Sequence, residues 1–273
     1  MENIILFLQK DMIEPQAWGW FHLLCISLTL FSLVFCWCRR KNHSEKQLKF
    51  ILAAYTIPTL ILEILKQISW SATVTEAGIV WDYQWYAFPF QLCTTPLIVC
   101  LICLFLKKNF LRDSLLSYVA FVTILGSIAV MIIPDDCFVD DILVNIHTTY
   151  LHFGSFIVSC YVLITREVKI KLEAFVKAIC IFIVMAMTAN ILNVVIYQSG
   201  ILHGETFNMF YISPFFISSL PVFNQIQQEV PYVVFLFTYL FGLSCGSLLI
   251  YGMTYVVQCV LKIPHKNKKS QSI

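Results

Sequence analysis

The chain has 273 residues, of which 59% are hydrophobic and only 12% are charged, and its formal net charge is +2. Soluble domains carry about 25% charged residues, so this composition excludes an ordinary soluble protein and predicts an all-α, polytopic membrane protein. Every cysteine except Cys137 falls within or at the edge of an apolar segment, which excludes a disulfide framework in the loops.

The length gives room for about seven crossings, at roughly 20 apolar residues each. We expect one transmembrane domain over residues 1–273. Its seven predicted transmembrane helices span 17–38, 48–69, 86–106, 114–133, 143–165, 174–198 and 231–261. Residues 206–224 are also apolar, but Pro214, Pro221 and several serines interrupt them, so we predict a re-entrant or interfacial segment there. Residues 1–16 contain Asp11, Glu14 and Pro15 and lack a basic start, so we expect no cleavable signal peptide.

Basic and acidic loops alternate along the chain. Lysine and arginine gather in residues 39–49, 107–113 and 166–177 and in the tail from 262, whereas acidic residues occupy the loops between them. The positive-inside rule then predicts an outer N-terminus and a cytoplasmic C-terminus, with the lysine-rich tail against anionic lipid of the inner leaflet. We expect a multi-pass protein of the cell membrane whose partners are membrane lipids, with no nucleic acid and no cofactor.

Ionisable residues inside apolar segments are costly, at least about 2.5 kcal/mol each on insertion scales, and indicate function by default. At 1.5 Å per residue, most such residues of this chain lie roughly 5–15 Å below the outer surface. They are His22; Glu63, Lys66 and Gln67; Gln91 and Cys93; His147 and His152; Asn190 and Asn193. The inner halves of the segments carry no comparable set, so we interpret this layer as a site.

Several of these residues also have a purely structural interpretation. Glu63 and Lys66 are three residues apart, so they can neutralise each other on one helix face. His22 follows Trp18 and Trp20 and is compatible with an interfacial aromatic belt. The asparagines Asn190 and Asn193 are compatible with hydrogen bonds between helices.

A thiol becomes a nucleophile when a base removes its proton or a cation favours the thiolate. Cys93 with His152 as base, and with Glu63 or Asn190 orienting that base, would form such a set, and His147 is the rival base. This set predicts nucleophilic chemistry at Cys93.

Two alternatives stay open. The first is a metal-dependent membrane hydrolase. Its zinc ion would be held by His22, His147 and His152 with Glu63 or Cys93. His147 and His152 are five residues apart, which is poorer for one ion than the i, i+4 spacing of helical zinc sites. The other alternative is a non-enzymatic small transporter or receptor whose ligand cavity is lined by Glu63, Lys66 and the histidines.

Short motifs over most of the chain resemble those of the YwaF-like integral membrane proteins, which are distantly similar to a vertebrate transmembrane acyltransferase of ether phospholipids. They are WGWFHLL around His22, LILEILKQ around Glu63, PFQLC ending at Cys93, HTTYLHFG from His147, NMFYIS and EVPYVVF.

The resemblance implies a seven-helix protein in which Cys93 accepts the acyl group and His152 is the base, with His147 as its rival. A similarity in outline to serpentine hydrolases of fatty-acid esters makes Thr94 or Thr95 the alternative nucleophile. Gln91 stands where the family usually has a histidine.

Overall fold

The structure is a computed structural model that describes residues 1–134 and 137–260. Asp135, Asp136 and the lysine-rich tail from residue 261 lie outside the described residues. Within the described ranges, six helices are long and apolar enough to cross a membrane, which confirms the predicted all-α, polytopic class. They cover Trp20–Asn42, Glu45–Ser71, Phe110–Ile132, Ile142–Thr165, Leu172–Gln198 and Tyr232–Val260.

These long helices are α2 (Trp20–Arg39) with the 3₁₀ turn η1 (Arg40–Asn42), α3 (Glu45–Ser71), α5 (Phe110–Tyr118) continuing through η3 (Val119–Thr123) into α6 (Ile124–Ile132), α7 (Ile142–Thr165), α8 (Leu172–Gln198) and α10 (Tyr232–Val260). Three of these helices begin at a capped first turn, in which a polar side chain accepts a hydrogen bond from a free N–H. Ser44 caps α3, Asn109 caps α5 and Asp141 caps α7.

The third predicted span, 86–106, is helical only in its second half. Residues Trp85–Ala87 form a 3₁₀ turn, η2, and the α-helix α4 covers only Thr95–Phe105. Two prolines explain the difference. Pro89 holds the preceding Phe88 in an extended conformation, and Pro96 fits a helix only in its first turn, where no N–H is needed. Residues 88–94 are therefore an irregular segment that leads into α4.

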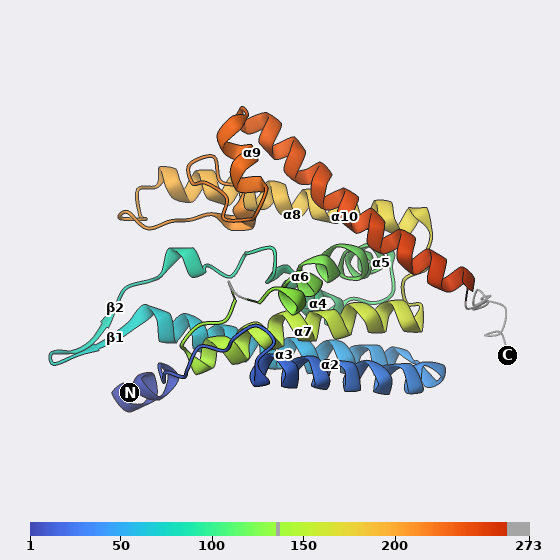
Figure 1. Cartoon of the computed structure of the whole chain (residues 1–273), viewed down its shortest axis with the longest axis horizontal. Coiled ribbons are helices and arrows are strands. Elements are labelled where there is room, and N and C mark those ends of the chain that lie inside the picture. The colour runs from blue at the N-terminus through green and yellow to red at the C-terminus, as the bar shows by residue number, and fades with distance from the viewer. Residues whose placement is uncertain (135–136, 261–273) are drawn as a thin grey trace.

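Helix α7 lies in the middle of the molecule, where it packs against α2, α3, α6 and η3. Figure 1 shows α2, α3 and α7 on one side and α8 and α10 on the other, with α4, α5 and α6 between them. Within α5–η3–α6 the backbone widens to a π-helix at Val119–Thr123, and all five of these residues are buried. Ser159 of α7 donates a hydrogen bond to the Val119 carbonyl at 2.8 Å, so the widened turn is fastened to the central helix.

One end of the molecule carries the N-terminus and an antiparallel hairpin, and the C-terminal end of α10 lies at the other end (Figure 1). The hairpin pairs β1 (Ala72–Thr75) with β2 (Gly78–Trp81) directly after α3. The short helix α1 (Glu2–Leu8) packs there too, and the Gln9 amide donates to the carbonyls of Ser69 and Ala72, each at 2.6 Å. These bonds satisfy carbonyls at the last turn of α3.

Residues 205–222 are irregular apart from the 3₁₀ turn η4 (Met209–Tyr211), and they lead through α9 (Phe223–Glu229) to α10. The segment is tied by side chains: Asn208 accepts from the Ser213 amide, and Gln227 both accepts from the Ser218 amide and donates to the Ser213 carbonyl. Internal hydrogen bonds of this kind are what irregular backbone requires when water is scarce. Whether the segment is re-entrant or interfacial stays a prediction.

Candidate functional site

The Glu63 carboxylate is the centre of a buried polar cluster between α3 and α7. Lys66 Nζ lies 2.8 Å from Oε1, Gln67 Nε2 donates to Oε1 at 2.8 Å, and His147 Nε2 lies 2.7 Å from Oε2. The His147 pair is at ion-pair distance, although the ring N–H is not aligned for a hydrogen bond. Glu63, Lys66 and His147 are all buried, so the predicted neutralisation within α3 is present and extends to α7.

Gln67 joins this cluster to the irregular segment before α4. Its amide also donates to the Ala87 carbonyl in η2 at 2.7 Å. The turn η2 is thereby held beside the C-terminal half of α3.

Cys93 lies in that irregular segment, directly before Thr94, which is the N-cap of α4. The charges of Lys66 and Glu63 both act on its sulfur, the lysine the more strongly of the two. The first N–H groups of a helix have no partner within it, and with the helix dipole they favour a negative charge at this position. Lys66 and the N-terminus of α4 thus favour a thiolate at Cys93, whereas burial of the sulfur and the Glu63 charge oppose it.

The loop that carries Cys93 is pinned from α5. Tyr118 Oη and Thr95 Oγ1 are 2.6 Å apart, and Thr95 donates its own proton to the Leu92 carbonyl, so the tyrosine is the donor to the threonine. Thr94 donates to the Gln91 carbonyl at 2.9 Å. Both threonine hydroxyls are therefore engaged within the loop, which favours Cys93 over either of them as a nucleophile.

The two histidines of α7 have different surroundings. His147 is paired with Glu63, whereas the His152 ring is buried and forms no hydrogen bond within the described ranges. No hydrogen bond joins Cys93 to either ring in the part of the chain that the structure describes. The predicted thiol–imidazole contact is thus not formed, although Glu63 does supply the expected carboxylate to one imidazole.

His22 and the two asparagines form hydrogen bonds that join separate segments of the chain. His22 is fully buried, accepts from the Trp18 amide through Nδ1 at 3.0 Å and donates to the Met131 carbonyl through Nε2 at 3.1 Å, so both ring nitrogens are occupied. Asn190 accepts from Tyr232 Oη at 2.6 Å. Asn193 binds both the amide and the carbonyl of Met209, at 2.7 and 3.0 Å. Each of these contacts joins segments far apart in the sequence.

The segment that Asn193 holds covers the irregular stretch before α4, a relationship that the sequence did not indicate. The ring centroids of Phe210 and Phe90 are 5.7 Å apart, those of Phe207 and Phe88 are 5.5 Å apart, and Glu205 accepts from the Trp85 amide. Phe210 and Tyr211 both have positive φ, at 58° and 59°, which is costly for aromatic residues and persists only where contacts impose it. In the sequence, the aromatic residues of NMFYIS were the only indication that this segment packs against another part of the chain.

The structure does not assemble the predicted zinc set. Among the described residues, no group of three or more His, Cys, Asp or Glu side chains is arranged to hold a metal ion. The physical reason is that His22 points to the Met131 carbonyl of α6, whereas His147 is paired with Glu63 of α3.

A second buried ion cluster lies at the other end of the helices, where the sequence pattern had indicated no comparable set. The Arg112 side chain is 1% exposed and makes a bidentate pair with Glu45 at 2.6 and 2.9 Å. Glu167 lies 2.7 Å from His43 and 3.5 Å from Arg112. The hydrogen bond with His43 lowers the pKa of Glu167 from 4.5 to about 2, and nearby Lys108 acts in the same direction against the cost of burial. From the sequence alone, Arg112 was counted only as a basic residue of the 107–113 loop.

Comparison with known proteins agrees with this architecture. The model of the TMEM164 family, a membrane protein family, matches residues 13–251. No curated protein and no solved structure gave a significant match. The matched range includes α2 to α10 almost completely, with Glu63, Cys93, His147 and His152. The chain therefore belongs to the TMEM164 family of multi-pass membrane proteins.

Proposed function

We propose that this protein transfers or hydrolyses acyl groups of membrane lipids, with Cys93 as the residue that accepts the acyl group. The observation that carries the proposal is the position of Cys93, in an irregular segment directly before the N-terminus of α4 and within reach of the Lys66 charge. A helix N-terminus and a cation both favour the thiolate, which is the reactive form, and they act against the burial of the sulfur, which disfavours it. The resemblance to YwaF-like proteins and to an ether-phospholipid acyltransferase points to the same residue.

The proposed reaction has two steps. A base takes the proton of Cys93, the thiolate adds to the carbonyl carbon of a lipid ester, a C–S bond forms, and the ester C–O bond breaks as the leaving alkoxide takes that proton. A lipid hydroxyl or water then adds to the thioester, the new C–O bond forms, the C–S bond breaks, and the sulfur regains a proton. Transfer and hydrolysis differ only in this second nucleophile.

We assign the base to His152, because its ring nitrogens are free of hydrogen bonds within the described ranges, whereas His147 Nε2 is paired with Glu63. For His152 to take the proton of Cys93, the 88–94 segment must move modestly toward α7. Catalytic hydrogen bonds are often long in the absence of substrate and shorten when substrate binds. Gln91 adds an acceptor beside Cys93, because its Oε1 is buried without a hydrogen-bond partner. That oxygen is suited to a hydroxyl of the incoming lipid.

The test uses the purified full chain in phosphatidylcholine vesicles that contain a phospholipid with an alkyne-tagged acyl chain. We expect a hydroxylamine-sensitive acyl label on Cys93 that disappears in Cys93→Ala and persists in Cys100→Ala, a matched buried thiol of α4. His152→Ala should slow labelling by about 10²-fold or more, as expected for loss of a general base. Label that persists in Cys93→Ala would overturn the proposal.

The transporter alternative predicts a different pattern. Cys93→Ala would then be silent and Glu63→Gln would abolish solute uptake. The structure favours the acyl-transfer proposal over this alternative, because Lys66, Gln67 and His147 already occupy the Glu63 carboxylate. The proposal includes residence in the cell membrane with the N-terminus outside, as the distribution of basic loops predicts.

A further inference from the structure

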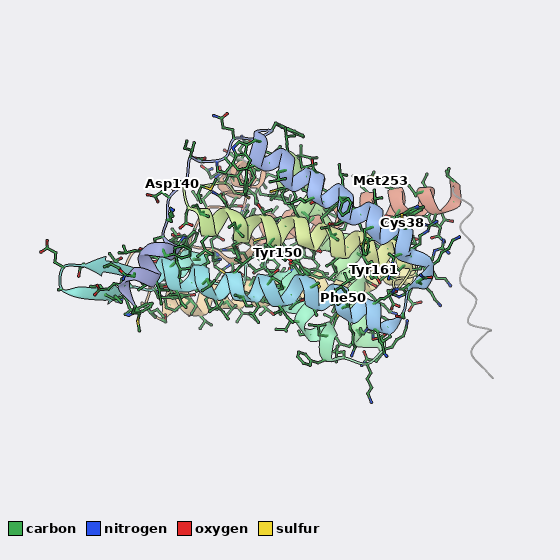
Figure 2. All side chains as sticks on the ribbon, turned by 90° about the horizontal axis from the view of Figure 1, so that it is seen from below. Cys38, Phe50, Asp140, Tyr150, Tyr161 and Met253 are labelled. Atoms are coloured by element: carbon green, nitrogen blue, oxygen red, sulfur yellow. The ribbon has the colours of Figure 1, made fainter. Side chains whose placement is uncertain are left out.

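A groove of about 290 Å³ runs along α7, between α2 and α3. Figure 2 shows α7 between these two helices, with Tyr150 at the boundary of α7 and α3. Helix α7 packs against both neighbours and forms the floor. The lining includes Leu28 and Thr29 from α2, Ile51 and Ala54 from α3, and Phe153 and Ile157 from α7.

Two sequence features shape the groove. Pro58 lacks an N–H, so the Ala54 carbonyl one turn earlier has no helical partner, and it accepts instead from Tyr150 Oη at 3.2 Å. Gly154 lets the Tyr55 ring lie against α7, since a Cβ at this position would be 2.8 Å from the ring. The two tyrosines therefore lie across the contact between α3 and α7.

The groove offers its occupant an apolar surface. Two hydroxyls that line it are turned toward backbone carbonyls: Thr29 donates to the Cys25 carbonyl and Ser32 to the Leu28 carbonyl, each at 2.8 Å. Tyr55 Oη likewise donates to the Leu151 carbonyl. The Thr149 hydroxyl accepts from the Cys25 thiol at 3.8 Å. All three lining helices are apolar membrane-crossing helices, and the groove lies along their middle turns, so its surroundings are hydrocarbon.

The groove follows the helix axes, as an acyl chain in a bilayer does. It extends at least from Cys25 to Ser32, which is about 10 Å of helix.

Tyr55 lies between the groove and the candidate site. Its ring lines the groove, its hydroxyl bonds to α7, and it is within electrostatic reach of Cys100 and Cys93. Along α7 the groove begins at Thr149, two residues after His147, and continues away from the Glu63 cluster to Val158. A lipid whose ester is at the depth of His147 would therefore direct its chain along the groove.

We propose that the groove between α2, α3 and α7 holds the hydrocarbon chain of the lipid that reacts at Cys93. This inference rests on the proposed function, and it adds the place where the acyl chain is recognised. Ala54 is the position through which the groove can be closed, because it is an exposed alanine on the groove wall.

The experiment places a phosphatidylcholine with a photoreactive diazirine in one acyl chain into phosphatidylcholine vesicles that contain the purified full chain. Crosslinked peptides of α2, α3 and α7 are compared with those of α10, whose Phe237, Phe241 and Leu249 are exposed outside the groove. Three variants are used: Ala54→Phe fills the groove, Ala129→Phe adds the same ring to an exposed alanine of α6 outside it, and Cys93→Ala removes the thiol.

We expect more photolabel on the groove peptides than on the α10 peptides. In Ala54→Phe the label on the groove peptides should fall about tenfold, which is equivalent to about 1.4 kcal/mol. In Ala129→Phe and Cys93→Ala the label on the groove peptides should be unchanged. The rate of acyl labelling at Cys93 should fall in Ala54→Phe only.

Equal photolabel on groove and α10 peptides, or photolabel on the groove peptides that Ala54→Phe leaves intact, would overturn the proposal that the groove holds the chain. An unchanged acylation rate in Ala54→Phe would overturn its link to the reaction. Acylation that persists in Cys93→Ala would instead remove the proposed function while the photolabel pattern still reports on the groove.

Discussion

Glu63 Oε2 and His147 Nε2 lie 2.7 Å apart and join α3 to α7 where both side chains are buried. Because the same carboxylate also pairs with Lys66, one acidic group compensates two basic side chains. A charge inside a membrane protein is tolerated when it has such partners, so the three residues depend on one another. Their stability is a property of the cluster and not of any single member.

The first prediction concerns this cluster. Glu63→Gln should reduce the free energy of unfolding by about 3 kcal/mol, because it leaves Lys66 buried without a counter-charge. The double variant Glu63→Gln with Lys66→Met should recover most of that loss, since it removes the unpaired charge as well. Thermal unfolding of the three proteins in the same detergent measures both effects. A double variant as unstable as Glu63→Gln would show that Lys66 is not the partner whose charge matters.

The second prediction concerns the contact between Gly154 and Tyr55. Gly154→Ala should destabilise the protein by about 1–3 kcal/mol, because the new methyl group would be 2.8 Å from the Tyr55 ring, which is held by its bond to Leu151. Gly126→Ala is the matched control in α6, where a Cβ meets nothing within 4 Å. There alanine should be neutral or stabilise by up to about 1 kcal/mol, from its higher helix propensity. Similar unfolding temperatures for the two variants would contradict the close approach of α3 and α7.

The third prediction concerns pH and the second ion cluster. The pKa of Glu167 is lowered to about 2 by its hydrogen bond with His43, so its contribution to stability is present above about pH 4.5 and is lost as the pH falls toward 2. Wild type should therefore unfold at a higher temperature than Glu167→Gln at neutral pH, and the difference should shrink between pH 4.5 and 2. Glu173→Gln is the control, because Glu173 is exposed and pairs only with Lys177 one turn away. A difference that stays constant below pH 4.5 would show that the Glu167 charge does not stabilise the fold.

Much of the architecture was predictable because it depends on local composition. The ends of α3, α7 and α8 fall within a few residues of the predicted spans, since long apolar runs between charged loops leave little choice to the backbone. The third span was less predictable: hydropathy treats 86–106 as uniform, whereas Pro89 and Pro96 decide where the helix begins. That local effect was legible in the sequence and moved Cys93 from the interior of a helix to its N-terminus.

The partners of the polar residues were not predictable to the same degree. Shared depth brought Glu63 and His147 together as expected, but the same argument grouped them with His22, which turns instead to the Met131 carbonyl. Depth gives only the position of a side chain along the membrane normal. Which neighbour it contacts depends on how each helix is rotated about its own axis. The burial of Arg112 was not predicted, because a basic residue at the end of an apolar span is usually solvated. Only the structure shows that Arg112 pairs with Glu45 and Glu167.

The sequence by itself determined that this chain is a helical membrane protein, which segments are apolar, and which costly side chains are present, because hydrophobic length and the cost of buried charge act locally along the chain. Only the tertiary structure decided which of those side chains meet. The pairing of Glu63 with His147, the covering of the Cys93 segment by Phe210, and the groove beside Tyr55 all depend on how separate helices pack and turn toward one another, and no local pattern specifies that.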